Sequence, residues 1–150
     1  PEQAWIVVEQ PRGEPYRLQF DPQSGTFTRT DRLSLAYQRG FRGVYGWIGG
    51  TGYPPQPHFD ALLITRQSPQ PGEVLHGFIC GMFKRQNGDH KFVAVDEQIR
   101  AQIPRADLVA LGKPDFEDLL CLYPLVGQGE GWFCAEVAYA YLKNNPPAHD

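Results

Sequence analysis

The stretch from residue 45 to residue 64 constrains the fold of this 150-residue chain more than any other. It opens with Tyr-Gly-Trp-Ile at residue 45, a segment of the aromatic and β-branched kind that favours strands. Three glycines and three prolines then interrupt regular structure before Asp60 and the apolar run that follows it. We therefore expect a strand end, a Gly/Pro-rich turn and a buried strand that starts at Asp60, a lone carboxylate.

Turn residues are frequent in the rest of the chain as well, which contains 16 Gly and 14 Pro. This density favours several short strands over a helical bundle. The hydrophobic fraction of 41% is that of a globular protein, and the length suits one domain with a sizeable core. We expect a single mainly β domain over residues 1–150, with a frayed tail at 143–150.

Charge and cysteine content exclude several classes of protein. The formal net charge of -3 gives no general electrostatic attraction to nucleic acid or to an anionic membrane. The apolar runs are far shorter than the roughly 20 residues that a membrane-spanning helix needs, and no basic-then-apolar leader opens the chain. Cys80, Cys121 and Cys134 form no Cys-x-x-Cys pair, so we expect reduced thiols in or near the core and a cytoplasmic or other reducing compartment.

Periodicity and breakers predict the elements in chain order. Strands are expected at 4–9, 16–20 and 26–30, so that residues 4 to 31 form a β-meander, and again at 61–65, 74–83 and 91–96. The Asn-Gly pair in the 85–90 segment predicts a tight hairpin turn. Pro114 can start a helix that ends before Pro124, and a second apolar helix face comprises Val137, Ala138, Tyr141 and Leu142.

The 45–64 stretch resembles the signature region of family I soluble inorganic pyrophosphatases. In that family, Tyr-Gly-Tyr-Ile is followed six residues later by Asp-Gly-Asp-Pro-x-Asp. When the two are aligned without a gap, the first two aspartates fall on Pro55 and Pro57, and the third is retained as Asp60. The resemblance therefore indicates a metal-binding region that has lost most of its charge.

Further positions match the family in the same element order over about residues 4 to 143. The strand-end Glu is Glu9, the Asp-Arg pair after the first hairpin is Asp31-Arg32, and Asp-x-Lys at the second hairpin begins at Asp89. Gly131-Trp132 matches a Gly-Trp that opens the last helix of the family. The resemblance implies a mainly β (α+β) fold, a twisted OB-like barrel of five to six strands flanked by two helices.

The resemblance also assigns roles to individual residues. It implies that Asp60 and Asp31 stand at catalytic positions and that Glu9, Asp60 and Asp89 are the residual metal ligands. Two family acids are replaced, because Gln19 stands for a Glu and the 85–90 turn has no counterpart of its first Asp. The positions that bind phosphate in the family are Arg17 (a Lys in the family), Arg32, Tyr45 and Lys91.

These substitutions bear directly on catalysis, because the family uses several Mg²⁺ ions to neutralise pyrophosphate and to activate water. Magnesium is bound by carboxylates, and a proline offers no side-chain ligand. We therefore expect a pseudoenzyme that needs no cofactor and serves as a binding or assembly subunit. An arginine can hold phosphate without a metal, so the pocket could still bind phosphate, pyrophosphate or an acidic segment of a protein partner.

The leading alternative is a Mg²⁺-dependent inorganic diphosphatase with an atypical site of Glu9, Asp60, Asp89 and either Asp31 or His58. A barrel that binds oligonucleotides is disfavoured by the acidic charge. The resemblance leaves room for a homo-oligomer, because family members form dimers or hexamers, and exposed aromatic residues leave room for another partner.

Each residue singled out above also has a purely structural interpretation. Glu9 could be a solvated charge at a strand end, and Asp60 could cap a turn. Arg17 and Arg32 could form surface ion pairs. Tyr45 and Trp47 are more typical of barrel core than of substrate contacts. His58 is expected as a partly exposed loop residue, with a transition-metal site shared with Asp60 and Asp89 as the alternative.

Overall fold

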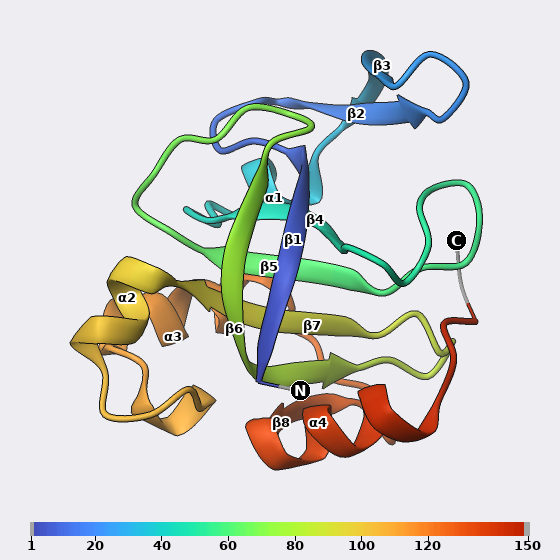
Figure 1. Ribbon diagram of the computed structural model, residues 1–150. Helices are drawn as coiled ribbons and strands as arrows, with labels where there is room; N and C mark the ends of the chain where they lie inside the picture. Colours follow the sequence, from blue (N-terminus) through green and yellow to red (C-terminus); the bar gives the residue numbers. More distant parts are fainter. Residues whose placement is uncertain (1, 149–150) are drawn as a thin grey trace.

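In the computed structural model, which describes residues 2–148, five strands close into a barrel (Figure 1). Its strands follow one another around the barrel in the order β1 (Gln3–Gln10), β4 (Val44–Ile48), β5 (Asp60–Ile64), β7 (Lys91–Asp96) and β6 (Val74–Lys84). Pairing of β1 with β6 closes the ring, and β8 (Gly131–Cys134) extends the sheet beyond β6. Only β5 and β7 pair in parallel among these strands. The predicted mainly β barrel with flanking helices is confirmed.

A separate hairpin projects from the barrel and consists of β2 (Tyr16–Asp21) and β3 (Thr26–Leu33). The predicted β-meander over residues 4 to 31 is therefore wrong. Both edges of β1 are occupied by β4 and β6, so β2 cannot pair with it and pairs with β3 instead. The hairpin and α4 (Ala135–Asn144) lie at opposite ends of the molecule (Figure 1).

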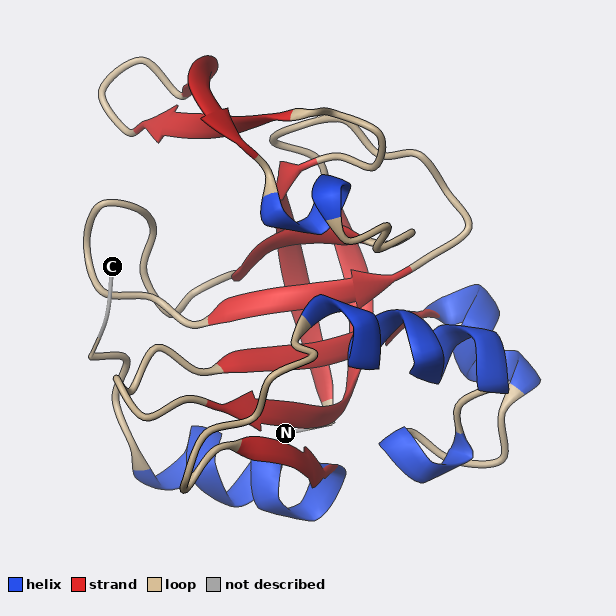
Figure 2. Cartoon of the chain, turned by 180° about the vertical axis from the view of Figure 1, so that it is seen from behind, coloured by secondary structure: helices blue, strands red, loops and turns tan. Residues whose placement is uncertain are grey.

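The helices lie outside the barrel, and Figure 2 shows α3 (Lys113–Leu122) crossing the outer face of the sheet. The helix predicted to start at Pro114 is confirmed, since that proline lies in the first turn of α3. Gly131-Trp132 opens strand β8 and not the last helix, which begins at Ala135. The remaining helical elements are short: α1 (Leu35–Gln38), α2 (Glu97–Gln102) and the 3₁₀ turn η1 (Leu108–Ala110).

Alternating residues of the central strands enter two hydrophobic clusters. Ala61, Leu63 and Phe92 belong to a cluster with residues from all five barrel strands, and α4 packs against it. Leu62 and Val93 face the opposite way and pack under α2 and α3. This alternation follows from the two-residue period of a strand, and it leaves the ends of β5 and β7 for polar residues.

The C-terminal helix is longer than the sequence predicts. The frayed tail was expected from residue 143, but α4 continues through Asn144, and residues 145–148 follow it without regular structure. The last part of the predicted tail, residues 149–150, lies outside the described residues. Among residues 2–148, no helix has the length and apolar character needed to cross a membrane.

Candidate functional site

The register of three neighbouring strands brings Tyr45, Asp60 and Lys91 together. Asp60 and Lys91 are the first residues of β5 and β7 and are directly paired in the parallel ladder. Tyr45 of β4 pairs with Leu62, two residues after Asp60, so all three side chains lie on the outer face of the barrel. The end of a parallel strand pair thus forms the floor of the candidate site.

Lys91 is the centre of a buried polar network. Its Nζ lies 2.7 Å from Asp60 Oδ2, 3.1 Å from Asp89 Oδ2 and 3.0 Å from the Tyr45 hydroxyl. An ammonium group has three N–H donors, so each of them has an acceptor. The other oxygen of Asp60, Oδ1, lies 2.8 Å from His58 Nε2. Both carboxylate oxygens of Asp60 are therefore engaged by cationic or hydrogen-bonding side chains.

His58 lies 6% exposed in this network, so the expectation of a partly exposed loop residue is wrong. Its Nδ1 lies 2.7 Å from the carbonyl oxygen of Gln56, while Nε2 faces the Asp60 carboxylate. Both partners can only accept, so both ring nitrogens must donate and the imidazole is doubly protonated. Burial lowers the pKa of His58, but its hydrogen bonds to Asp60 and Gln56 outweigh burial and raise it.

The electrostatics of the Asp60–Lys91 pair follow from this arrangement. Burial alone would raise the pKa of Asp60, yet the hydrogen bond from His58 and the charge of Lys91 bring it well below its ordinary value. Burial likewise opposes the charge on Lys91, while Tyr45 and Asp60 raise its pKa above the ordinary value. The two groups form a buried ion pair, in which the negative charge of Asp60 is already neutralised.

Glu9 is the other acid of this region and is buried near the end of β1, not solvated as a strand-end charge. Burial raises its pKa from 4.5 to about 7, and the negative charge of Asp60 acts in the same direction, while Arg17 opposes both. About half of the molecules therefore carry a protonated Glu9 at neutral pH.

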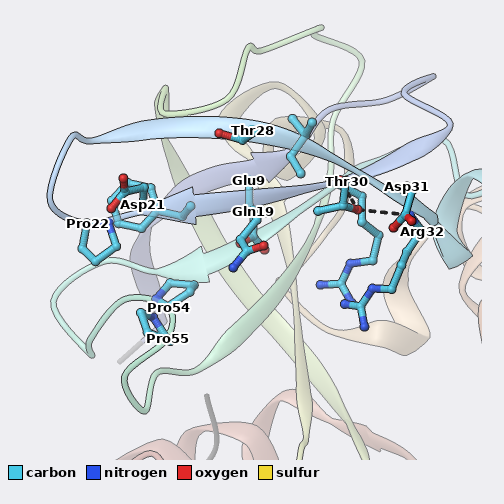
Figure 3. Close-up of a pocket in the computed structure, with 13 residues that line it drawn as sticks. Glu9, Gln19, Asp21, Pro22, Thr28, Thr30, Asp31, Arg32, Pro54 and Pro55 are labelled. Carbon is cyan, nitrogen blue, oxygen red and sulfur yellow. Dashed lines mark hydrogen bonds between the residues drawn. The ribbon is translucent and has the colours of Figure 1, made fainter.

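Above Glu9, the hairpin covers an open cavity of about 1050 Å³, which we call the hairpin groove. Figure 3 shows Gln19 and Arg32 extending from the hairpin into this space, with Pro54 and Pro55 on the facing loop. Trp47 holds the hairpin in place, because its ring lies 5.2 Å from that of Phe20. The groove is also lined by Glu9, Arg17 and Asp31.

Arg17 and Arg32 differ from the other arginines in this structure. Neither guanidinium group makes a hydrogen bond or an ion pair with any residue from 2 to 148. Both side chains are exposed and line the hairpin groove. The structural interpretation as surface ion pairs is therefore wrong, and both guanidinium groups are available to an anion.

A second, smaller cavity of about 170 Å³ lies on the other side of Arg17, between α1, the end of α3 and the network. We call it the inner cavity. Its walls include Tyr45, Leu62, Lys91 and Tyr123. Since Arg17 lines both the hairpin groove and the inner cavity, its side chain marks the boundary between them.

The loop before β5 explains how Asp60 and His58 become buried. Gly52 has φ +132°, and a Cβ there would lie 1.9 Å from the carbonyl oxygen of Pro57, so the two arms of the loop touch. Thr51 Oγ1 accepts a hydrogen bond from the Phe59 amide at 3.2 Å. The closed loop packs His58 against Trp47, with ring centroids 6.3 Å apart.

The predicted site residues thus fall into two groups. Tyr45, Asp60, Asp89 and Lys91 meet in the buried network, and Glu9, Arg17, Asp31 and Arg32 line the hairpin groove. Tyr123 and Arg85 of the inner cavity were not predicted as site residues, because only packing of α3 against the β6–β7 turn brings them there. For His58 the position beside Asp60 was visible in the sequence, but its burial was not.

The residues present do not fit the magnesium cluster that the resemblance implies. Among residues 2–148, no group of three or more His, Cys, Asp or Glu side chains is arranged to hold a metal ion. The expected transition-metal alternative with His58, Asp60 and Asp89 is therefore not supported by the geometry. Both Asp60 oxygens face His58 and Lys91, and Pro55 stands in the loop without a ligand atom.

Comparison with known proteins agrees with the fold and the residue pattern. A family model of the inorganic pyrophosphatases matches residues 6–111, whereas no curated protein sequence matches. The chain superimposes on an inorganic phosphatase from Anaplasma phagocytophilum with a TM-score of 0.72 and 20% identity, covering 95% of this chain and 91% of that one. For an inorganic pyrophosphatase from Neisseria gonorrhoeae the values are 0.69, 22%, 93% and 86%. For that of Thermus thermophilus they are 0.67, 19%, 95% and 88%.

The structural likeness supports the fold, and the family match extends over more than half of the chain. Strand order, the Asp-Arg pair of the hairpin and the Asp-x-Lys of the second turn lie where the resemblance requires them. The chain belongs to the inorganic pyrophosphatase family.

Proposed function

We propose that this member of the family has lost pyrophosphate hydrolysis and serves as a binding or assembly subunit with a metal-free anion site. The observation that carries the proposal is the engagement of both Asp60 oxygens, one by His58 and one by Lys91. A Mg²⁺ ion at Asp60 would have to displace a buried ammonium or imidazolium group. Separating a buried ion pair leaves an uncompensated charge, which is strongly unfavourable.

The anion site is proposed at Arg17 and Arg32, on the wall of the hairpin groove. Both guanidinium groups are exposed there, and neither is hydrogen-bonded within residues 2–148. A guanidinium group binds a phosphate through two parallel hydrogen bonds and keeps its charge at any physiological pH. Phosphate, pyrophosphate or an acidic segment of a partner has the chemistry that this pair recognises.

Exposed apolar side chains support the role of a binding subunit. Leu125 is 88% exposed and Val109 is 68% exposed, and Trp5 of β1 is also largely uncovered. A protein partner or a second copy of the chain could cover such residues. The three cysteines are free, and Cys80 is buried, which supports a reducing compartment such as the cytoplasm.

A phosphate-release assay tests the loss of catalysis. The purified chain is incubated with pyrophosphate and either Mg²⁺ or Mn²⁺, beside an active family member such as the Thermus thermophilus enzyme under the same conditions. We expect release at background. Turnover within a few hundredfold of the active enzyme would overturn the proposal and favour the Mg²⁺-dependent diphosphatase.

A titration without metal tests the anion site separately. We expect calorimetry to detect binding of pyrophosphate, and Arg32→Ala to weaken it about 10- to 100-fold, as expected for loss of a charge-assisted hydrogen bond. The matched control is Arg105→Ala, an exposed arginine outside the hairpin groove and the inner cavity. Equal affinities of Arg32→Ala and Arg105→Ala would contradict the assignment.

A further inference from the structure

The inner cavity differs from the hairpin groove in what it can offer a ligand. Its apolar walls include Ala36, Leu62 and Leu122, together with the ring of Tyr123. Tyr123 stacks on Phe83 with centroids 4.4 Å apart and an interplanar angle of 6°, so its ring has a fixed orientation. These residues provide a rigid, largely apolar surface.

The polar groups of the inner cavity already have partners. Gln10 donates through Nε2 to the carbonyls of Glu14 and Tyr16 and accepts the Leu18 amide at Oε1. Ser34 Oγ accepts the Tyr37 amide. A ligand in this space therefore gains apolar contact and displaces no existing hydrogen bond.

The same is true of the charged side chains. Lys91 uses its three donors on Asp60, Asp89 and Tyr45, and Arg85 pairs with Asp89 at 3.6 Å. Arg17 is different, because its guanidinium group has no partner within residues 2–148. One available cation thus stands at the boundary of a small apolar space.

We propose that the site takes an aryl phosphate monoester, with its ring in the inner cavity and its phosphate on Arg17 at the edge of the hairpin groove. This inference rests on the proposed anion site and names its ligand class. A cavity of about 170 Å³ holds a group the size of one benzene ring, since an apolar cavity of about 150 Å³ binds benzene.

Pyrophosphate fits this space less well than an aryl phosphate does. Its second phosphoryl group would lie against Ala36, Leu62 and Leu122, where no free donor replaces the lost water. Burying an aryl ring there removes apolar surface from water and stabilises the complex. The inner cavity therefore favours an organic phosphate over an inorganic one.

A ligand series on the unmodified protein tests this inference. Calorimetry without metal measures the dissociation constants of phenyl phosphate, inorganic phosphate and phenol. We expect phenyl phosphate to bind at least about tenfold more tightly than either fragment, because it uses both the guanidinium group and the apolar walls. Trp132, whose ring lies 5.9 Å from that of Tyr123, gives a fluorescence reading of the same titration.

A cavity-filling variant locates the ring. Ala36→Leu should reduce the affinity for phenyl phosphate about tenfold and leave that for inorganic phosphate unchanged, because the added atoms occupy the inner cavity. The control is Ala101→Leu on the exposed side of α2. Circular dichroism establishes that each variant is folded, and the ligand series decides the question if Ala36→Leu is not.

The outcomes separate this inference from the proposed function. Equal affinities for phenyl phosphate and inorganic phosphate would overturn the aryl phosphate and leave the anion site in place. Binding of neither would overturn both. Tight binding of phenyl phosphate that persists in Arg17→Ala would also contradict the inference, because the ring alone would then account for the affinity.

Discussion

The buried network around Lys91 and the hairpin groove contain similar side chains but use their charges in opposite ways. In the network, every donor of Lys91 and both oxygens of Asp60 have partners within the protein. In the groove, Arg17 and Arg32 have none within residues 2–148. Charges satisfied internally contribute to the fold, whereas charges left available can bind a ligand. The acidic half of the ancestral type of site has thus become structural, and the basic half has not.

The largest predicted effect comes from breaking the network. Lys91→Met leaves Asp60 buried without its main counter-charge, and we expect the free energy of unfolding to fall by about 3–5 kcal/mol. Urea unfolding at pH 7 measures this loss. Adding Asp60→Asn should recover part of it, because the double variant has no uncompensated carboxylate at residue 60.

The control for this experiment is Lys113→Met. The Lys113 side chain is 89% exposed, and its ion pair with Glu117 spans 3.9 Å, so little change in unfolding free energy is expected. A loss below about 1 kcal/mol for Lys91→Met would contradict the structural role of the network, since a broken buried pair costs more than that.

A pH dependence of stability should come from Glu9. Its pKa is about 7 in the native protein against 4.5 as the ordinary value, so the native state binds more protons between these limits. The unfolding free energy must therefore fall as pH rises through this window, by about 2–3 kcal/mol between pH 5 and pH 8. Denaturant titrations at several pH values measure the slope.

Glu9→Gln isolates this contribution, because glutamine does not titrate. We expect the variant to be more stable than the wild type at pH 8 and nearly equal to it at pH 5. The pKa of His58 is also raised, so its stabilising charge is lost as pH rises further, and this slope should remain in the variant. Parallel pH profiles for wild type and variant would show that Glu9 is ionised throughout.

A smaller effect on stability is expected for the arginines of the groove. Replacing both Arg17 and Arg32 with alanine should change the unfolding free energy by less than about 0.5 kcal/mol, because the variant loses no hydrogen bond within the described residues. The same variant should lose anion binding. A destabilisation above about 1.5 kcal/mol would mean that these side chains hold the hairpin, and the contrast between the two regions would disappear.

The fold was largely predictable from the sequence, because turn residues and strand periodicity are local signals. The exceptions are non-local: β1 is paired with β4 and β6 and not with β2, and Gly131-Trp132 becomes a strand through pairing with β6. Propensity alone does not contain these partners.

The candidate site was predictable in its residues but not in their state. The order of motifs identified Asp60 and Lys91, and their register in β5 and β7 explains why they meet. The doubly protonated state of His58 and the raised pKa of Glu9 depend on burial, which arises from the closed loop and from Trp47. Such packing has no signature in a single sequence.

The smallest predicted effect concerns the two prolines aligned with family aspartates. Pro55→Asp with Pro57→Asp adds two carboxylates to the loop, yet we expect phosphate release from pyrophosphate with Mg²⁺ to stay at background. Both oxygens of Asp60 would still face His58 and Lys91, and Glu9 would still be partly protonated. A metal cluster needs several ionised carboxylates free at once, and two new ones do not release those already engaged. If the double variant gained Mg²⁺-dependent turnover, the missing loop ligands and not the buried network would account for the loss of catalysis.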